Sequence, residues 1–221
     1  SRGLGDVYKR QDGTLAEMCG NGIRVFARFL VEEGLAGPGV IDIDTRAGVH
    51  RVTVPESGDI IVDMGHATTP RARAVPIVTV GSRSWPSVGV LVPNPHAVVF
   101  VDDLDVAGEL IDPPDVAPSA VFPEGVNVEF VVDRGPAHLA MRVHERGVGE
   151  TMACGTGACA VAWAARRRDE VGAASTYRID VPGGTLHVTE HADGRLDLIG
   201  PAVIVARGSL APSWWREVVA T

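Results

Sequence analysis

The sequence has little of several features on which large classes of protein depend. Lysine is almost absent, because the only one is Lys9, in a head segment without apolar periodicity. Pyridoxal phosphate chemistry, which needs a lysine Schiff base, is therefore disfavoured. Three cysteines are too few for a disulfide scaffold, and an odd number is typical of a reducing compartment. Because no signal-like apolar segment stands near the start, we expect a cytoplasmic protein.

Positive charge and long apolar runs are also scarce. The chain carries 20 Lys and Arg against 28 Asp and Glu, a net charge of −8, which disfavours a nucleic-acid partner. Apolar stretches such as residues 97–101 are far shorter than the roughly 20 residues that span a bilayer, so no membrane segment is expected. With 45% hydrophobic and 22% charged residues the composition is that of an ordinary globular protein. A small molecule is the expected partner.

An internal repeat dominates what is present. The sequence MCGNGI, which begins at Met18, recurs as ACGTGA, which begins at Ala153, at an offset of 135 residues. Similar strand-like segments follow each copy, and Gly65 and Gly200 are also separated by 135 residues. Residues 17–67 and 151–202 therefore look like two copies of one unit of a helix and strands, which predicts two similar lobes.

Apolar spacing predicts two helices and a series of short strands. One helix follows Cys19 and stops near Gly34, and the other covers residues 158–168. Strands are expected at residues 40–45, 50–55, 59–64, 75–80, 88–92, 97–101, 126–132, 139–144, 177–181, 185–189, 195–199 and 203–207. The four prolines of residues 112–123 predict a loop, and residues 68–76 are expected to cross between the lobes. The fold class is α+β.

Each cysteine of the repeat stands in a Cys-Gly-x-Gly loop before a helix. The glycines let a ligand approach the backbone closely, and the first helical turn presents free N–H groups that bind anions. The positive end of the helix also predicts a thiol pKa below the usual value of about 8.5. An amino-acid carboxylate fits such amides while Cys19 and Cys154 exchange the Cα proton on opposite faces, which is racemisation or epimerisation. Amides in a closed cleft stabilise the carbanion.

The third cysteine and the histidines suggest no further site. Cys159 lies inside the second predicted helix, and we expect it in the core. The seven histidines are scattered rather than placed at ligand spacing, so no metal is expected.

Longer motifs around both cysteines resemble those of the diaminopimelate epimerase family. They occupy residues 12–14, 16–22, 94–96, 126–127, 145–147 and 149–157. The resemblance implies interconversion of LL- and meso-diaminopimelate without cofactor or metal, in bacterial lysine and peptidoglycan precursor synthesis. It also implies two pseudosymmetric lobes, each a mostly antiparallel sheet or barrel around a central helix. Residues 1–63, completed by 201–221, would form the first lobe and residues 64–200 the second, with a homodimer as the candidate assembly.

The same resemblance assigns roles to particular residues. It implies proton transfer by Cys19 and Cys154, with the reacting carboxylate held by the amides of the two loops. The residues that would bind substrate are Gly20, Asn21, Asn94, Asn127, Glu145, Arg146, Gly155 and Thr156. His96 and Glu145 would adjust the thiol pair, since a nearby charge shifts a thiol pKa. An Arg146 fork with carboxamides suits the distal amino-acid end of the substrate.

The chain departs from the family before the first cysteine. Arg10 stands where the family has a substrate-binding asparagine, and the family's opening segment is missing. We therefore expect exposed sheet edges and poor solubility, and the activity of this fragment stays open. Two alternatives stay open. One is a proline or hydroxyproline racemase, although that family carries His where this chain has Asn21. The other is a non-catalytic domain that binds an anion through amides, against which the two thiols argue.

Overall fold

The computed structural model describes residues 18–169, 175–209 and 211. Within them there are two helices and fourteen strands, and the strands form one large sheet and one small sheet. The large sheet has the order β1-β2-β3-β14-β13-β12-β10-β9-β7-β6, with β11 paired to β10. Most neighbours are antiparallel, and only β10 with β12 and β7 with β9 are parallel. This is the α+β architecture of two lobes that the sequence predicted.

Strand bounds follow the predicted periodicity closely. The strands of the large sheet are β1 (Gly39–Thr45), β2 (Gly48–Val54), β3 (Ile60–His66), β6 (Val88–Val92), β7 (Asn94–Phe100), β9 (Asn127–Gly135), β10 (His138–Glu145), β11 (Gly149–Thr151), β12 (Thr176–Val181), β13 (Gly184–Glu190) and β14 (Arg195–Gly200). The small sheet contains β4 (Ile77–Val80), β5 (Arg83–Pro86) and β8 (Asp115–Ala117) in the order β5-β4-β8. Short 3₁₀ turns, η1 (Leu104–Ala107) and η2 (Ser119–Val121), flank β8.

One predicted strand is absent from the described residues, and three observed strands were not predicted. Residues 203–207 form no strand, because no described strand lies beside them to supply hydrogen bonds, and Val205 is exposed. The proline-rich residues 112–123 are not wholly a loop, since β8 pairs there with β4 between the prolines. Strands β5 and β11 are too short for an apolar alternation to reveal them.

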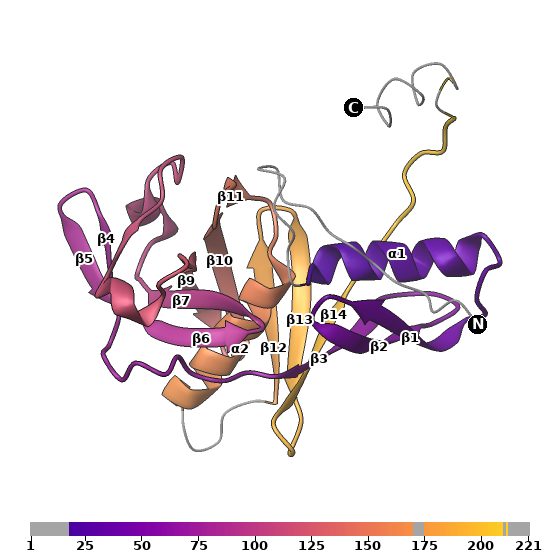
Figure 1. Cartoon of the computed structure of the whole chain (residues 1–221), viewed down its shortest axis with the longest axis horizontal. Helices are drawn as coiled ribbons and strands as arrows, with labels where there is room; N and C mark the ends of the chain where they lie inside the picture. Colours follow the sequence, from indigo (N-terminus) through magenta and orange to yellow (C-terminus); the bar gives the residue numbers. More distant parts are fainter. Residues whose placement is uncertain (1–17, 170–174, 210, 212–221) are drawn as a thin grey trace.

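Helix α1 (Gly20–Glu32) packs on one face of β1, β2 and β3. Its buried positions Ile23, Ala27 and Leu30 recur at helical spacing. The helix ends before Gly34, whose φ of +67° lies in the left-handed region that favours glycine. Figure 1 shows α1 lying across the strands β1 and β2, with its N-terminal end directed toward the middle of the molecule.

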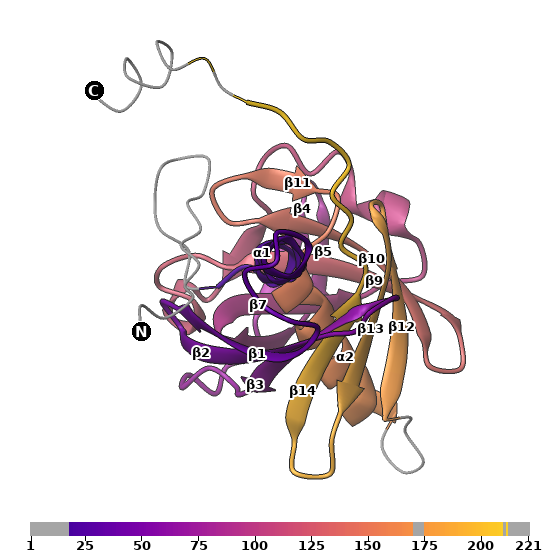
Figure 2. The same cartoon turned by 90° about the vertical axis from the view of Figure 1, so that its right-hand side faces the viewer.

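Helix α2 (Gly155–Asp169) is enclosed by the strands β6, β7, β9, β12, β13 and β14. Figure 2 shows α2 beside the strands β12, β13 and β14. Small residues fill most of its first ten positions, and ten of its fifteen residues are buried, which lets the surrounding strands approach closely. The helix starts three residues before the predicted residue 158, because the carbonyl of Cys154 already accepts the N–H of Ala158.

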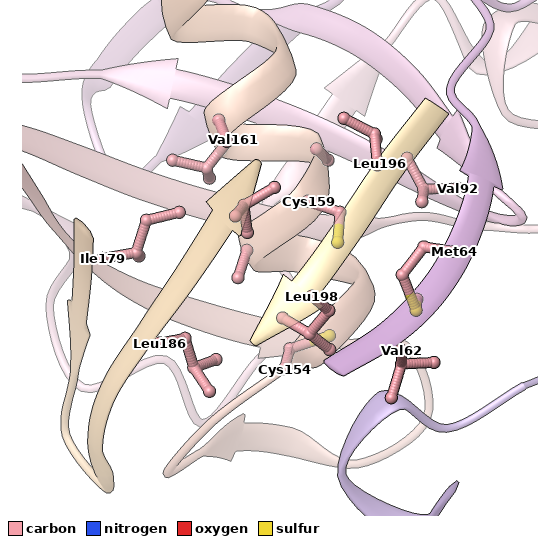
Figure 3. Packing of buried hydrophobic residues seen from close by; sticks show 14 of the residues in the cluster. Val62, Met64, Val92, Cys154, Cys159, Val161, Ile179, Leu186, Leu196 and Leu198 are labelled. Atoms are coloured by element: carbon pink, nitrogen blue, oxygen red, sulfur yellow. The ribbon is translucent and has the colours of Figure 1, made fainter. Parts of the chain in front are cut away.

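One apolar cluster runs through both halves of the large sheet. It joins Ile23 of α1 to Val161 of α2 through strand residues such as Val62 and Leu198. Figure 3 shows Cys159 with its sulfur among these side chains. Cys159 is fully buried, as predicted, and burial raises the pKa of its thiol to about 12, although the nearby Arg24 charge opposes the shift.

The predicted division into lobes falls within this continuous sheet. The boundary after residue 63 lies inside β3, which pairs with β14. Of the segment expected to complete the first lobe, residues 201–209 and 211 are described, and Arg207 forms ion pairs with Glu32 and Glu33 near the end of α1. Neither helix of the described part has the length and apolar character needed to cross a membrane.

Candidate functional site

The two repeated loops meet where the helices α1 and α2 begin. A Cβ added to Gly155 would lie 2.9 Å from the Cα of Gly20, and one added to Gly20 would lie 3.0 Å from the Cα of Gly155. Both positions also abut the side chain of Leu198. Only glycine at both sites allows so close an approach of the two helix ends. The cysteines that precede these glycines are thereby brought to one place.

Each cysteine caps its own helix in the same way. Gly22 donates its N–H to the Cys19 sulfur at 3.3 Å, and Gly157 donates its N–H to the Cys154 sulfur at 3.4 Å. The amides of Gly20, Asn21, Gly155 and Thr156 come before the first helical hydrogen bond and meet no acceptor among the described residues. Two pairs of N–H groups therefore remain available for an anion.

A cavity of about 710 Å³ opens between the two loops. The predicted residues that line it are Cys19, Gly20, Asn21, Asn94, Asn127, Glu145, Cys154, Gly155 and Thr156. Asn21 also ties the loops together, since its Nδ2 donates to the carbonyl of Ala153 at 3.0 Å. Apolar side chains of α1, including Val25 and Phe29, and Ile204 complete the wall.

Asn94, which lines this cavity, has a buried side-chain acceptor. Its side chain is buried, and its Nδ2 donates to the Met18 carbonyl and to the Thr156 hydroxyl, each at 3.3 Å. Its Oδ1 accepts no hydrogen bond in the described part of the chain. A buried acceptor without a donor costs free energy, so the site is suited to a ligand that donates an N–H or O–H.

Two carboxylates and burial raise the pKa of Cys154. Burial, then the charges of Glu145 and Glu129, raise the pKa of this thiol well above its usual value, against the weaker effect of hydrogen bonds from Thr156 and Gly157. The predicted lowering of the thiol pKa by the helix is therefore wrong for Cys154. The amides of a helix end act over a short range, whereas this sulfur lies out of water beside negative charge.

Two predicted residues do not line the cavity. His96 is fully buried, and its Nδ1 lies 2.6 Å from Oε1 of Glu129, which is also fully buried. Arg146 lines a neighbouring cavity of about 490 Å³ with Gly125 and His144, and its Nη1 donates to the carbonyl of Glu124. Its backbone N–H donates to Oδ1 of Asn127 at 2.9 Å, which connects it to the first cavity.

The structure also reveals residues that the sequence analysis missed. Glu129 and Cys154 both lie against Gly157. A Cβ added to Gly157 would lie 2.7 Å from the Glu129 carboxylate and 3.3 Å from the Cys154 sulfur. Arg24 lies one helical turn after Gly20 and is only 5% exposed. An acidic residue inside the apolar run of residues 126–132 and an arginine on the apolar face of a helix were the available signals.

Part of the predicted site cannot be compared with the structure. Arg10 and the motif at residues 12–14 lie outside the described residues. Among residues 18–169, 175–209 and 211, no three His, Cys, Asp or Glu side chains are grouped so that they could hold a metal ion.

The fold defines a class of proteins with two α+β lobes, to which several solved structures belong. The solved structures that resemble this fold include a predicted epimerase from Pseudomonas aeruginosa, with a TM-score of 0.66, 17% identity and coverage of 89% of this chain and 75% of that one. They also include a probable proline racemase from Agrobacterium radiobacter, with a TM-score of 0.62, 17% identity and coverage of 94% and 72%. Likenesses this distant establish the fold alone.

The family follows from closer relatives. A diaminopimelate epimerase of Streptomyces coelicolor is 54% identical over 218 residues, which cover 96% of this chain and 75% of the relative. The family model for diaminopimelate epimerase matches residues 4–70 and 89–208. The chain belongs to the diaminopimelate epimerase family.

Proposed function

We propose that this cavity epimerises diaminopimelate at Cα, using Cys19 and Cys154 as the two proton-transfer groups. One thiolate removes the Cα proton, and the other thiol delivers a proton to the opposite face of the carbanion. The pair ends with its proton on the other sulfur, so the reaction needs no cofactor and reverses by the same steps. The single observation that carries the proposal is the matched capping of two helices by cysteines that line one cavity.

The polar groups of the cavity fit the reacting end of an amino acid. The amides of Gly20, Asn21, Gly155 and Thr156 suit the carboxylate and the negative charge that develops next to it. The unused Oδ1 of Asn94 suits the ammonium group. We propose that Asn127, Glu145 and Arg146 bind the remainder of the substrate. His96 adjusts the pKa values of the thiol pair through Glu129. Arg146 reaches the first cavity through Asn127.

The family and composition support further parts of the proposal. We propose a role in bacterial lysine biosynthesis in the cytoplasm, with the chain acting as a homodimer and without a nucleic-acid partner. We retain the proposed lobes of residues 1–63 with 201–221, and of residues 64–200.

Deuterium exchange tests the reaction. With LL-diaminopimelate in heavy water, the protein should incorporate deuterium at Cα and produce the meso isomer, both measured by NMR and chiral chromatography. Cys19→Ala and Cys154→Ala should each lower epimerisation by at least about a thousandfold, because each removes one proton-transfer group. Cys159→Ala, a core cysteine outside the cavity, is the matched control and should retain turnover. Normal epimerisation in either of the first two variants would refute the two-base assignment.

The two alternatives make different predictions for the same experiment. A proline racemase would exchange the Cα proton of proline faster than that of diaminopimelate. A domain that only binds an anion would exchange neither, because amides alone transfer no proton.

A further inference from the structure

The side chain of Arg24 joins the start of α1 to the end of β14. It is buried, and its Nη1 donates to the carbonyl of Gly20 at 3.0 Å. Its Nη2 donates to Oδ1 of Asn21 at 3.1 Å, and its Nε donates to the carbonyl of Pro201 at 3.5 Å. Gly20 and Asn21 open α1, and Pro201 directly follows β14. One guanidinium therefore connects the first cysteine loop to the sheet.

The same hydrogen bonds continue to the second cysteine loop. Asn21 accepts from Arg24 through Oδ1 and donates through Nδ2 to the carbonyl of Ala153, at 3.0 Å. Ala153 lies 132 residues after Asn21 and directly precedes Cys154. Two hydrogen bonds thus lead from the guanidinium, through one carboxamide, to the backbone that carries the second thiol of the proposed reaction.

The arginine determines which way the Asn21 carboxamide points. A guanidinium has only N–H donors, so the carboxamide must turn its oxygen toward Arg24. Its nitrogen is then directed to the Ala153 carbonyl, which requires a donor. A reversed carboxamide would set nitrogen against guanidinium and oxygen against carbonyl, and both hydrogen bonds would be lost. Arg24 therefore selects the orientation in which Asn21 joins the two loops.

The internal repeat shows that a helix start of this kind does not itself need an arginine. The residue 135 positions after Arg24 is Cys159, and the residue 135 positions after Asn21 is Thr156. Helix α2 nevertheless begins with the same cysteine cap as α1. The arginine and the carboxamide belong to the first copy alone, where they connect it to the second copy.

Asn21 and Ala153 line two cavities. Both line the first cavity, of about 710 Å³, and both line a further cavity of about 450 Å³. Arg24 lines the cavity of about 450 Å³, together with Leu186 and Pro201. The bonded pair therefore forms part of the wall of both, and Arg24 supports it from the side away from the proposed reaction.

We propose that Arg24 is a positioning residue that fixes the Asn21 side chain and thereby the separation of the two cysteine loops. The inference rests on the proposed function, because proton transfer between one carbon and two sulfurs requires both loops in register. A displacement of about 1 Å can lower a rate about a hundredfold. Loss of the connection should affect kcat more than KM, since the groups proposed to bind the remainder of the substrate stay in place.

A double-mutant cycle tests whether Arg24 acts through Asn21. Arg24→Gln, which replaces the fork of donors by one amide, should lower kcat for epimerisation about ten- to hundredfold and change KM less than about threefold. Asn21→Ala keeps the backbone amide and should have a similar effect. The double variant should be no slower than Asn21→Ala alone. Additive losses in the cycle, or an unchanged kcat in Arg24→Gln, would overturn the proposal.

Two further variants separate positioning from stability. Arg24→Lys retains a donor for Asn21 and should recover part of the lost kcat. Arg28→Gln is the control and should retain kcat, because Arg28 lies one turn further along α1 and donates to the carbonyl of Gly58. A lower melting temperature of Arg24→Gln with native kcat well below that temperature would mark a purely structural role and refute the inference.

Hydrogen exchange followed by mass spectrometry tests the connection without turnover. Peptides that cover residues 151–157 should exchange at least about tenfold faster in Arg24→Gln and Asn21→Ala than in the native chain, whereas those of β12 should not change. Equal exchange in residues 151–157 would refute the connection.

The outcomes for the two proposals are separable. Absence of epimerisation by the native chain, with faster exchange of residues 151–157 in the variants, would refute the proposed reaction and retain the connection. Normal epimerisation with equal exchange would do the reverse. If Arg24→Gln does not fold, the same comparison of Arg24→Lys and Asn21→Ala with the native chain still decides.

Discussion

Burial and neighbouring charge affect the pKa of the Cys154 thiol more than the helix that it caps, and they raise it. Its sulfur accepts the N–H of Gly157, as the sequence pattern predicts, yet Glu129 and Glu145 lie close enough to oppose ionisation. Glu129 is a fully buried carboxylate and its Oε2 has no partner among the described groups. At the scale of the residue, a charge a few ångströms away in a dry site outweighs partial charges at a helix end.

Removing the charge of Glu129 therefore makes Cys154 easier to ionise. Glu129→Gln should lower the pH midpoint of Cys154 alkylation by roughly one unit and leave that of Cys19 in place, as measured by mass spectrometry of each site. Asp133→Asn, a more exposed carboxylate on the same strand, is the control and should shift neither thiol. An unchanged Cys154 midpoint in Glu129→Gln would show that burial and Glu145, rather than Glu129, keep the thiol protonated.

Small residues at the N-terminal ends of the two helices determine how closely the helices approach each other. Gly20 and Gly155 allow the N-terminal turns of α1 and α2 to touch, and Leu198 of β14 closes the contact. At the scale of the element, the distance between the N-terminal ends of the two helices depends on these two glycines. Each has a hydrogen atom where other residues have a side chain.

A methyl group at this contact should separate the two caps. Gly155→Ala places a Cβ 2.9 Å from the Cα of Gly20, so one helix must shift, at a cost of about 1–3 kcal/mol in the free energy of unfolding. Urea denaturation should detect the loss, and Cα exchange should fall more than tenfold because the two sulfurs no longer face one carbon. Gly37→Ala, with open space around the added Cβ, should change neither quantity. Full activity in Gly155→Ala would contradict the close contact.

The whole molecule depends on a sheet that passes from one half of the repeat to the other. The parallel pair β10 and β12 is one of three places where this sheet joins strands distant in sequence without a hairpin. His138 of β10 lies 2.7 Å from Asp180 of β12. Asp180 has its pKa lowered to about 2, since hydrogen bonds from His138, Thr185 and Arg178 outweigh the cost of partial burial.

This carboxylate makes stability depend on acid pH. A pKa below the unfolded value of about 3.9 stabilises the fold above that pH, and the contribution disappears as the pH falls toward 2. Asp180→Asn should remove a contribution of roughly 1 kcal/mol or less at pH 7 and flatten the decrease of stability between pH 5 and pH 2, as measured by urea unfolding. Asp44→Asn, an exposed residue of β1, is the control. A parallel decrease in the native chain and Asp180→Asn would exclude this role.

The sequence alone determined the local structure and the chemistry of the two loops. Apolar spacing along the chain encodes which face of a strand or helix is buried, so most strands and both helices followed from it. The repeated Cys-Gly-x-Gly pattern placed thiols and free amides at helix beginnings, because capping depends on neighbours within a few residues. Strand β8 escaped notice because its hydrogen bonds come from β4, far away in the sequence.

Only the tertiary structure decided how those groups are charged and where they meet. Glu129 is 25 residues before Cys154 and Arg24 lies on the other copy of the repeat from Cys159, yet each influences its thiol through space. Electrostatic energy depends on distance and on exclusion of water, and neither quantity is written in the spacing of residues along a chain. The raised thiol pKa of Cys154, the buried guanidinium of Arg24 and the contact of two glycines all follow from that folding.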